Sequence, residues 1–310
     1  MKIVNYGSIN LDHVYQVDHI VQPGETLLAL DQNLFCGGKG LNQSIALAKA
    51  GADVCHAGIV GEDGDILLDA LRAARVDITH VRRAPGASAH TVIQVDKNGQ
   101  NCIIVFSGEN MHPSEEDIDR ILADFTAGDA VLMQNELYNT PLMMRKAAEK
   151  GMTIIFNPSP VNREMLSYPL DKVSWFLLNE IEGEALTGET DPEKILDSLE
   201  QKYPGSSVVL TLGKSGAWAL DRGQRFFQPA FEVKAVDTTA AGDTFTGFFL
   251  AGISGDLSIP DALRRAAFAS SIAVSRKGAA DSIPTAEEVS RADNTEQPLF
   301  TPPAPAFPDQ

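Results

Sequence analysis

Short apolar runs alternate with helix-like stretches along most of this 310-residue sequence. The runs at 3–6, 130–134 and 153–156 are too short for a helix and lack the polar alternation of a half-exposed strand. Such runs are typical of strands that are buried on both faces, and buried strands joined by helices form a parallel sheet. The pattern therefore predicts an α/β fold built on a mostly parallel sheet.

Polar side chains follow the apolar strands directly. The residues in question carry amide or carboxylate groups and are Asn135, Glu136, Asn157, Asn179 and Glu182. Because the carboxyl ends of parallel strands meet at one edge, we expect a polar cleft there, where ligands of open α/β sheets bind. Asn10 and Asp12 follow the strand at 3–6 and share one face of an extended segment, although both types are also common turn formers.

A second, smaller sheet is predicted from a break in the alternation. Strand-like runs at 91–95 and 102–106 flank Asn98-Gly99, a strong signal for a two-residue hairpin turn. With the extended stretches at 14–18 and 25–35, this hairpin can form a cover over the main sheet. We expect one domain over residues 1–296, with a β lid built from about 11–36 and 88–108 and a proline-rich tail at 297–310.

Three of the four residues that follow Cys36, just before a predicted helix, are glycines. A dinucleotide fingerprint would need a third glycine near Gln43, and a P-loop would need Ser or Thr after Lys39, so both motifs fail. Glycine lets backbone approach a ligand closely, with Lys39 and Asn42 as donors; the alternative is a flexible turn before the helix.

The Gly-Lys-Ser at 213–215 also fails as a P-loop. Val208 stands where that motif needs glycine, and 217–220 reads as a strand instead of a helix. A strand–turn–strand with Thr211, Gly213 and Gly216 can instead hold phosphate through backbone N–H groups.

The segment Asp237-Thr238-Thr239-Ala240-Ala241-Gly242-Asp243 precedes an apolar helix-like run. Small residues at a helix start leave N–H groups free for an anion. Asp243 then has two interpretations: it caps the helix, or it accepts a proton from a substrate hydroxyl. Asn179 and Glu182 likewise either approach a hydrated Mg²⁺ or form a helix cap with a first-turn glutamate.

Charge and cysteine content exclude several classes of protein. With 42 acidic against 25 basic residues, the chain lacks the positive surface that nucleic-acid binding needs. The three cysteines, Cys36, Cys55 and Cys102, are odd in number and form no CxxC, which indicates reduced thiols. No apolar run approaches the roughly 20 residues of a membrane span, so we expect a cytoplasmic protein with no membrane partner.

Three blocks in order, 37–43, 179–182 and 237–243, resemble the ribokinase (PfkB-type) carbohydrate kinase family, and within it the ribokinases, over roughly residues 1–290. The resemblance implies a ribokinase-like three-layer α/β/α sandwich with a β lid that joins two subunits into a homodimer. It implies transfer of phosphate from ATP to a sugar hydroxyl, with D-ribose favoured. Alternatives are another sugar or a nucleoside (fructose, a keto-deoxy sugar acid, an adenosine-like molecule), or a non-catalytic sugar-sensing relative.

The resemblance also assigns roles to positions of this sequence. Asp243 would be the base, beside an anion hole of Ala240, Ala241 and Gly242. The sugar-binding positions would be Asn10, Asp12, Gly38, Lys39, Asn42 and Glu136, together with Asp243. The nucleotide-binding positions would be Asn179, Thr211, Gly213, Ser215, Gly216 and Gly242.

Two metal ions are implied as well. Glu182 would act on Mg²⁺ through water. A K⁺ site, mostly of backbone carbonyls, would involve Asp237, Thr239, Ala273, Arg276, Gly278 and Ser282. Ser44 departs from the family pattern, in which alanine is usual at this position.

Overall fold

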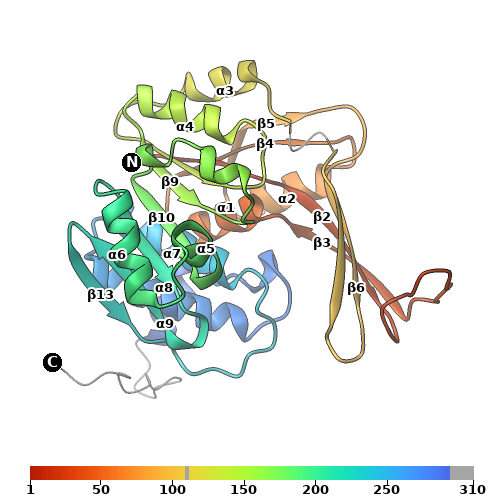
Figure 1. Cartoon of the computed structure of the whole chain (residues 1–310). Coiled ribbons are helices and arrows are strands. Elements are labelled where there is room, and N and C mark those ends of the chain that lie inside the picture. Colours follow the sequence, from red (N-terminus) through yellow and green to blue (C-terminus); the bar gives the residue numbers. More distant parts are fainter. Residues whose placement is uncertain (109–111, 294–310) are drawn as a thin grey trace.

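A nine-stranded sheet forms the centre of the computed structural model, which describes residues 1–108 and 112–293 (Figure 1). Its strands, in sheet order, are β13 (Gln224–Gln228), β12 (Ala217–Asp221), β11 (Ser207–Thr211), β10 (Trp175–Asn179), β9 (Thr153–Asn157), β8 (Ala130–Gln134), β1 (Ile3–Tyr6), β4 (Val54–Val60) and β5 (Asp77–Arg83). All neighbours run parallel except the β11–β12 and β12–β13 pairs, which are antiparallel. The predicted mostly parallel sheet is confirmed.

Helices cover both faces of this sheet. One layer contains α1 (Lys39–Lys49), α2 (Asp65–Ala73), α7 (Ala241–Ser254), α8 (Ile259–Val274) and α9 (Ala286–Asp293). The other contains α3 (Glu115–Leu122), α4 (Thr140–Glu149), α5 (Glu180–Thr187) and α6 (Pro192–Lys202). Successive strand residues serve opposite layers, so that Ile3 packs in the first core and Val4 in the second. This arrangement is the predicted three-layer α/β/α sandwich.

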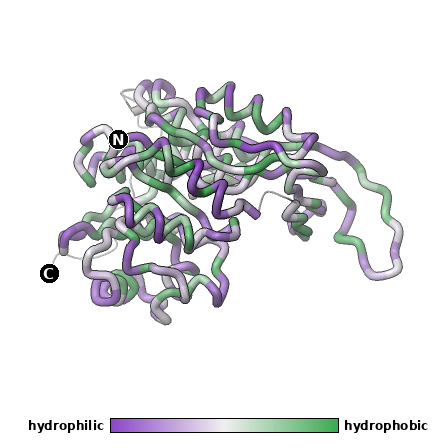
Figure 2. Tube along the Cα trace, turned by 90° about the horizontal axis from the view of Figure 1, so that it is seen from above, coloured by the Kyte–Doolittle hydropathy of each residue, from purple (hydrophilic) through white to green (hydrophobic). Residues whose placement is uncertain are grey.

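A four-stranded sheet projects from the sandwich (Figure 1 and Figure 2). Its order is β3 (Asp31–Gly37), β2 (Asn10–Gln16), β6 (His90–Val95) and β7 (Asn101–Phe106). The β2–β6 pair is parallel and the two outer pairs are antiparallel. We call it the lid sheet; its action as a lid stays a prediction.

The hairpin between β6 and β7 differs from the expected two-residue turn. Val95 pairs with Asn101, so five residues, 96–100, form the loop. The Asp96 carboxylate accepts hydrogen bonds from the N–H groups of Asn98 (2.8 Å) and Gln100 (2.9 Å), which stabilises this longer loop. The strand expected at 25–35 is also shorter, since β3 starts only at Asp31.

Some elements have no clear sequence signal. Strands β5 and β13 lie at the two sheet edges and are rich in polar residues, so they lack the apolar runs of the central strands. Within 1–108 and 112–293, no helix is long and apolar enough to cross a membrane. The tail predicted at 297–310 lies outside the described residues.

Candidate active site

The glycine-rich turn before α1 packs tightly against the link between β1 and β2. The N–H of Leu41 donates to the carbonyl of Ser8 (2.9 Å). A Cβ on Gly40 would lie 2.5 Å from the carbonyl carbon of Gly7, so no side chain fits there. Glycine is therefore required at this position by the protein's own backbone.

Asp243 lies at the N-terminal end of α7, which packs beside α1. It is the third residue of the helix and is 9% exposed. Its Oδ2 accepts a hydrogen bond from Nδ2 of Asn42 (3.1 Å), and its Oδ1 accepts one from Nε2 of Gln43 (2.9 Å). The cap position is Ala240, with no side-chain cap bond, so the interpretation of Asp243 as a helix cap is wrong.

The start of α7 provides backbone donors. Ala240 has a left-handed φ of 61°, and its N–H and that of Gly242 donate to no acceptor within 1–108 and 112–293. The N–H of Ala241, by contrast, donates to the carbonyl of Thr238 at 3.2 Å. Two of the three predicted anion-hole amides are thus free, at the positive end of the helix dipole.

The ammonium group of Lys39 interacts electrostatically with three carboxylates of the predicted site, those of Asp243, Glu136 and Glu182. Burial alone would lower the pKa of its ammonium group, but the carboxylates of Asp243, Glu136 and Glu182 raise it above the ordinary value. These carboxylates come from α7, the end of β8 and α5, so the fold brings three distant segments to one lysine. The positive charge of Lys39 is therefore maintained at neutral pH.

Burial acts in the opposite direction on the carboxyl groups of Asp243 and Glu136, whose pKa values it raises. Desolvation raises the pKa of Asp243, while Lys39 and the amides of Gln43 and Asn42 pull it back. Desolvation also raises the pKa of Glu136, whose Oε2 accepts a hydrogen bond from the Ser8 hydroxyl.

Asp12 lies where the lid sheet meets the sandwich. Its Oδ1 accepts a hydrogen bond from the Thr91 hydroxyl (2.6 Å), and burial raises its pKa. A Cβ on Gly37 would lie 1.9 Å from Asp12 Oδ2, so glycine leaves the space that the carboxyl occupies. Asn10 pairs with Gly37 in the β2–β3 ladder, two residues from Asp12 on the same strand face.

The predicted nucleotide positions come together at the ends of β10 and β11, where Asn179 and Thr211 are register partners. Gly213–Ser215 forms a short 3₁₀ turn before β12, so the rejection of a P-loop is confirmed. Gly216 has φ +115°, and a Cβ there would lie 2.2 Å from the carbonyl oxygen of Gln228. This glycine is required by backbone packing.

Asn179 and Glu182 form a capping box at the start of α5. The N–H of Glu182 donates to Asn179 Oδ1, and the N–H of Asn179 donates to Glu182 Oε2, both at 2.9 Å. The helix-cap interpretation is confirmed. It uses one oxygen of Glu182 and leaves the metal role untested. In the described part of the chain, no group of three or more His, Cys, Asp or Glu could hold a metal directly.

The residues predicted to hold K⁺ come from two segments that meet. The Asp237 carboxylate accepts hydrogen bonds from the N–H groups of Thr239 (2.9 Å) and Gly278 (3.1 Å). The Arg276 guanidinium turns to Glu288 (2.8 Å), as expected if only its main chain belongs to the site. The Ala273 carbonyl accepts a hydrogen bond from the Arg276 N–H (3.0 Å), and Ser282 is buried.

Two buried amide residues were not predicted from the sequence: Gln43, which bonds Asp243, and Gln134, which bonds Gln43. Gln43 and Gln134 are each 1% exposed and hydrogen-bond to each other. A glutamine inside an Ala- and Leu-rich helix, and another at the end of an apolar strand, are the signals that could have drawn attention to them.

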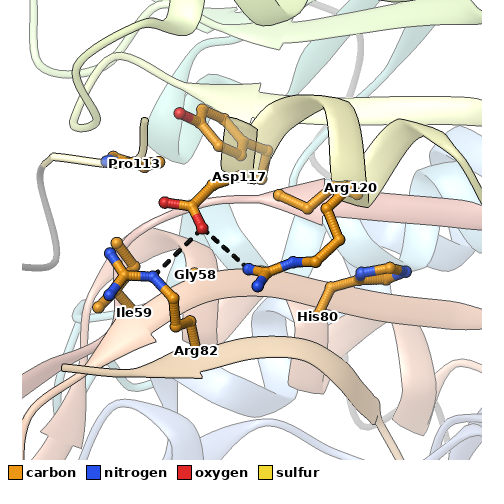
Figure 3. Close-up of a pocket in the computed structure, with 9 residues that line it drawn as sticks. Gly58, Ile59, His80, Arg82, Pro113, Asp117 and Arg120 are labelled. Carbon is orange, nitrogen blue, oxygen red and sulfur yellow. Dashed lines mark hydrogen bonds and ion pairs between the residues drawn. The ribbon is translucent and has the colours of Figure 1, made fainter. Parts of the chain in front are cut away.

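A pocket between β4, β5 and α3 contains none of the predicted site residues (Figure 3). Asp117 forms ion pairs there with Arg82 (3.2 Å) and Arg120 (2.9 Å). Because these charges already pair with one another, we assign the pocket no part in the chemistry around Asp243.

Comparisons with known proteins agree on one family. The family profile described as pfkB family carbohydrate kinase matches residues 1–286. A ribokinase from Haemophilus influenzae is 35% identical over 295 residues, which cover 91% of this chain and 95% of the relative. A deoxyribokinase from Salmonella typhimurium is 31% identical over 300 residues, covering 93% and 97%. The solved structure of Arabidopsis thaliana ribokinase complexed with ribose and ATP superposes with a TM-score of 0.81 at 28% identity, covering 94% of this chain and 97% of that one.

Proposed function

Because the chain belongs to the pfkB family of carbohydrate kinases, we propose that it transfers the γ-phosphate of ATP to D-ribose and forms ribose 5-phosphate. The chain is an ATP-dependent sugar kinase, and the resemblance predicted from its sequence is confirmed. The observation that carries the proposed mechanism is the placement of Asp243, buried at the free amides of a helix start and close to the Lys39 charge.

In the proposed reaction, Asp243 accepts the proton of the sugar hydroxyl as the hydroxyl oxygen forms its bond to the γ-phosphorus. The bond between that phosphorus and the oxygen of the departing ADP breaks at the same time. Lys39 and the N–H groups of Ala240 and Gly242 offset negative charge on the transferred group. The N–H of Ala241 joins them if its 3.2 Å bond to Thr238 opens.

The sugar would lie between the lid sheet and α1, held by Asn10, Asp12, Gly38, Lys39, Asn42 and Glu136. Asn42 supports this position directly, since its Oδ1 is buried and lacks a hydrogen-bond partner in the described part of the chain. A buried acceptor without a partner is costly, and a sugar hydroxyl could fill that place. Asp12 and Glu136 add further acceptors for hydroxyl groups.

The nucleotide would extend from Lys39 toward the ends of β10 and β11, along Asn179, Thr211, Gly213, Ser215 and Gly216. The N–H groups of Ser215 and Gly216 are already bonded within their turn, so the adjacent Gly213 offers the freer amide to a phosphate. Mg²⁺ would neutralise charge on the phosphates, with Glu182 acting through water. The oxygen left free by the capping box fits that indirect role.

The choice of sugar is tested by measuring ADP release with a panel of acceptors at matched concentrations. D-ribose should give the highest kcat/KM, above deoxyribose, fructose, a keto-deoxy sugar acid and adenosine. The deoxyribokinase relative makes deoxyribose the sharpest comparison. Turnover of another acceptor with none of ribose would overturn the ribose assignment, and no turnover of any acceptor would favour the sugar-sensing alternative.

We also propose that K⁺ activates the enzyme through Asp237, Thr239, Ala273, Arg276, Gly278 and Ser282. Carboxylate and carbonyl oxygens suit a hard cation, and residues 237–239 lead directly into the start of α7. A cation there would add order and charge beside the anion hole. Rates in K⁺ should therefore exceed those in tetramethylammonium at equal ionic strength. Equal rates would contradict the site.

Finally, we propose that the lid sheet joins two subunits and that the protein is cytoplasmic. The edge strand β7 exposes Ile103, Ile104, Val105 and Phe106, each to at least 50%, and an apolar edge of this kind favours pairing. The three thiols are unpaired, as expected in a reducing compartment. Light scattering that gives the mass of a single chain would contradict the proposed homodimer. A disulfide bond in the native protein would contradict the proposed cytoplasmic location.

A further inference from the structure

A chain of buried amide side chains leads from Asp243 into the central sheet. Gln43 Nε2 donates to Asp243 Oδ1 (2.9 Å), and Gln43 Oε1 accepts a hydrogen bond from Gln134 Nε2 (2.7 Å). Gln134 Nε2 also donates to Asn5 Oδ1 (2.9 Å). Gln134 belongs to β8 and Asn5 to β1, so these hydrogen bonds connect Asp243, through Gln43, to two neighbouring central strands.

We propose that Gln43 is a positioning residue for Asp243, and that Gln134 and Asn5 keep the Gln43 amide in the required orientation. Through its hydrogen bond to Oδ1, Gln43 fixes the rotation of the carboxyl group so that a lone pair faces the sugar hydroxyl. The inference rests on the proposed role of Asp243 as the base.

The rotation of Asp243 needs such a constraint. The torsion of an aspartate carboxyl about its Cβ–Cγ bond is broad, so that packing alone holds it weakly. Nδ2 of Asn42 bonds the other oxygen, Oδ2, at 3.1 Å, but the Oδ1 of Asn42 has no hydrogen-bond partner in the described part of the chain, so its amide is held less firmly. The Gln43 amide, by contrast, uses both of its N–H groups and its oxygen: it donates to Asp243 and to Asn157 Oδ1 (3.1 Å) and accepts from Gln134. Gln43 is therefore the constraint that persists through the reaction.

The orientation of each amide follows from the one before it. An ionised carboxylate only accepts hydrogen bonds, so Gln43 must present its NH₂ group to Asp243 and its oxygen to Gln134. Gln134 must then present NH₂ to Gln43 and to Asn5. Asn5 in turn donates to the carbonyl of Gly40 (2.8 Å) and to Ser44 Oγ (2.9 Å). A flip of one amide would bring like groups face to face in the buried interior.

The far end of the network supplies a matched control. Ser44 Oγ lies 2.7 Å from His56 Nδ1, and burial lowers the pKa of His56 to about 4, so the imidazole is neutral at pH 7. Ser44 follows Gln43 on α1 and is equally buried, but it does not contact Asp243. Ser44→Ala thus disturbs the network and leaves the Asp243 hydrogen bonds in place.

The test compares Gln43→Leu, Gln134→Leu and Ser44→Ala in the full-length enzyme, with ribose and ATP as substrates and circular dichroism to confirm folding. Gln43→Leu should lower kcat about 10- to 100-fold and leave both KM values within about twofold, because a misplaced base slows the chemical step more than binding. Gln134→Leu should lower kcat by less. The double variant Gln43→Leu/Gln134→Leu should be no slower than Gln43→Leu alone, since both substitutions remove the same constraint on the Asp243 carboxyl group. Ser44→Ala should lower the melting temperature and leave kcat near wild type.

The outcomes separate this inference from the proposed function. Wild-type kcat in folded Gln43→Leu and Gln134→Leu, with Asp243→Asn inactive, would overturn the positioning role and leave the base assignment intact. An equal loss of kcat in Gln43→Leu and Ser44→Ala, matched by equal losses of melting temperature, would also overturn it, because it indicates general structural damage. An active Asp243→Asn variant would remove the base itself.

Discussion

Replacing Asp243 by Asn is expected to lower kcat by about 10²- to 10⁴-fold, the usual contribution of a general base. The amide cannot accept the proton of the sugar hydroxyl, while its size and shape are almost those of the acid. Asn offers one acceptor oxygen, so either the Asn42 or the Gln43 donor loses its partner. Binding of ribose, measured by calorimetry, should remain within a few-fold of wild type because the pocket keeps its shape.

Asp117→Asn is the matched control for this change. Asp117 is also the third residue of a helix, α3, and is also 9% exposed. It pairs with Arg82 and Arg120 in the pocket of Figure 3, away from the predicted site residues, so the control should lose stability and keep kcat. Wild-type turnover by Asp243→Asn, or an equal loss in both variants, would remove Asp243 from its proposed role.

Replacing Lys39 by Met is expected to lower kcat/KM for ATP about 10²- to 10³-fold, as seen when one stabilising donor is removed from a catalytic site. Lys39 is the charge shared by Asp243, Glu136 and Glu182. Its loss leaves these carboxylates without their common counter-charge and removes an attraction for the phosphates of ATP. The three acids and the nucleotide would then repel one another.

The same variant should change the pH dependence of kcat. Asp243 must be ionised to act as the base, and burial already raises its pKa, so activity should fall as the pH drops through that raised value. Lys39 lowers the pKa of Asp243, so Lys39→Met should raise that pKa. The acidic limb of the curve of kcat against pH should then move to higher pH. Part of the lost activity should return as the pH increases.

Two controls separate charge from packing in this experiment. Lys39→Arg keeps the positive charge and should leave the acidic limb near its wild-type position. Lys49→Met removes a second half-buried lysine from α1, one that bonds the carbonyl of Ile283 (2.7 Å), and should not move the limb. An unchanged limb in Lys39→Met, or an equal change in Lys49→Met, would contradict the coupling between Lys39 and Asp243.

Several features of the site could be predicted because they depend on residue type and local order. Apolar strands followed by polar residues predicted the parallel sheet and its polar edge, and Asn135, Asn157 and Asn179 do lie at the ends of β8, β9 and β10. The edge strands β5 and β13 were missed because exposed edges tolerate polar residues and show no such run.

Other features were interpreted incompletely because their cause lies far away in the sequence. The glycines before α1 were interpreted together, as a place of close approach to a ligand or as a flexible turn, whereas Gly40 is required by the approach of Gly7, 33 positions earlier in the sequence. Gln43 drew no attention as an isolated residue, since only the approach of α7 brings Asp243 to its amide. Glu182 could be read as a cap or as a metal-related residue, and the capping box shows that the first interpretation holds for one of its oxygens.

The sequence by itself determined the α/β class, the family and the chemical types of the reacting groups, because alternation, glycine spacing and a lone acid at a helix start are local properties. Tertiary structure alone decided which groups meet. Whether Lys39 lies near three carboxylates, and which amides hold Asp243, depends on how α1, α5 and α7 pack on the sheet. The physical reason is that charge interactions and hydrogen bonds act over a few ångströms in space, whatever the separation of the residues along the chain.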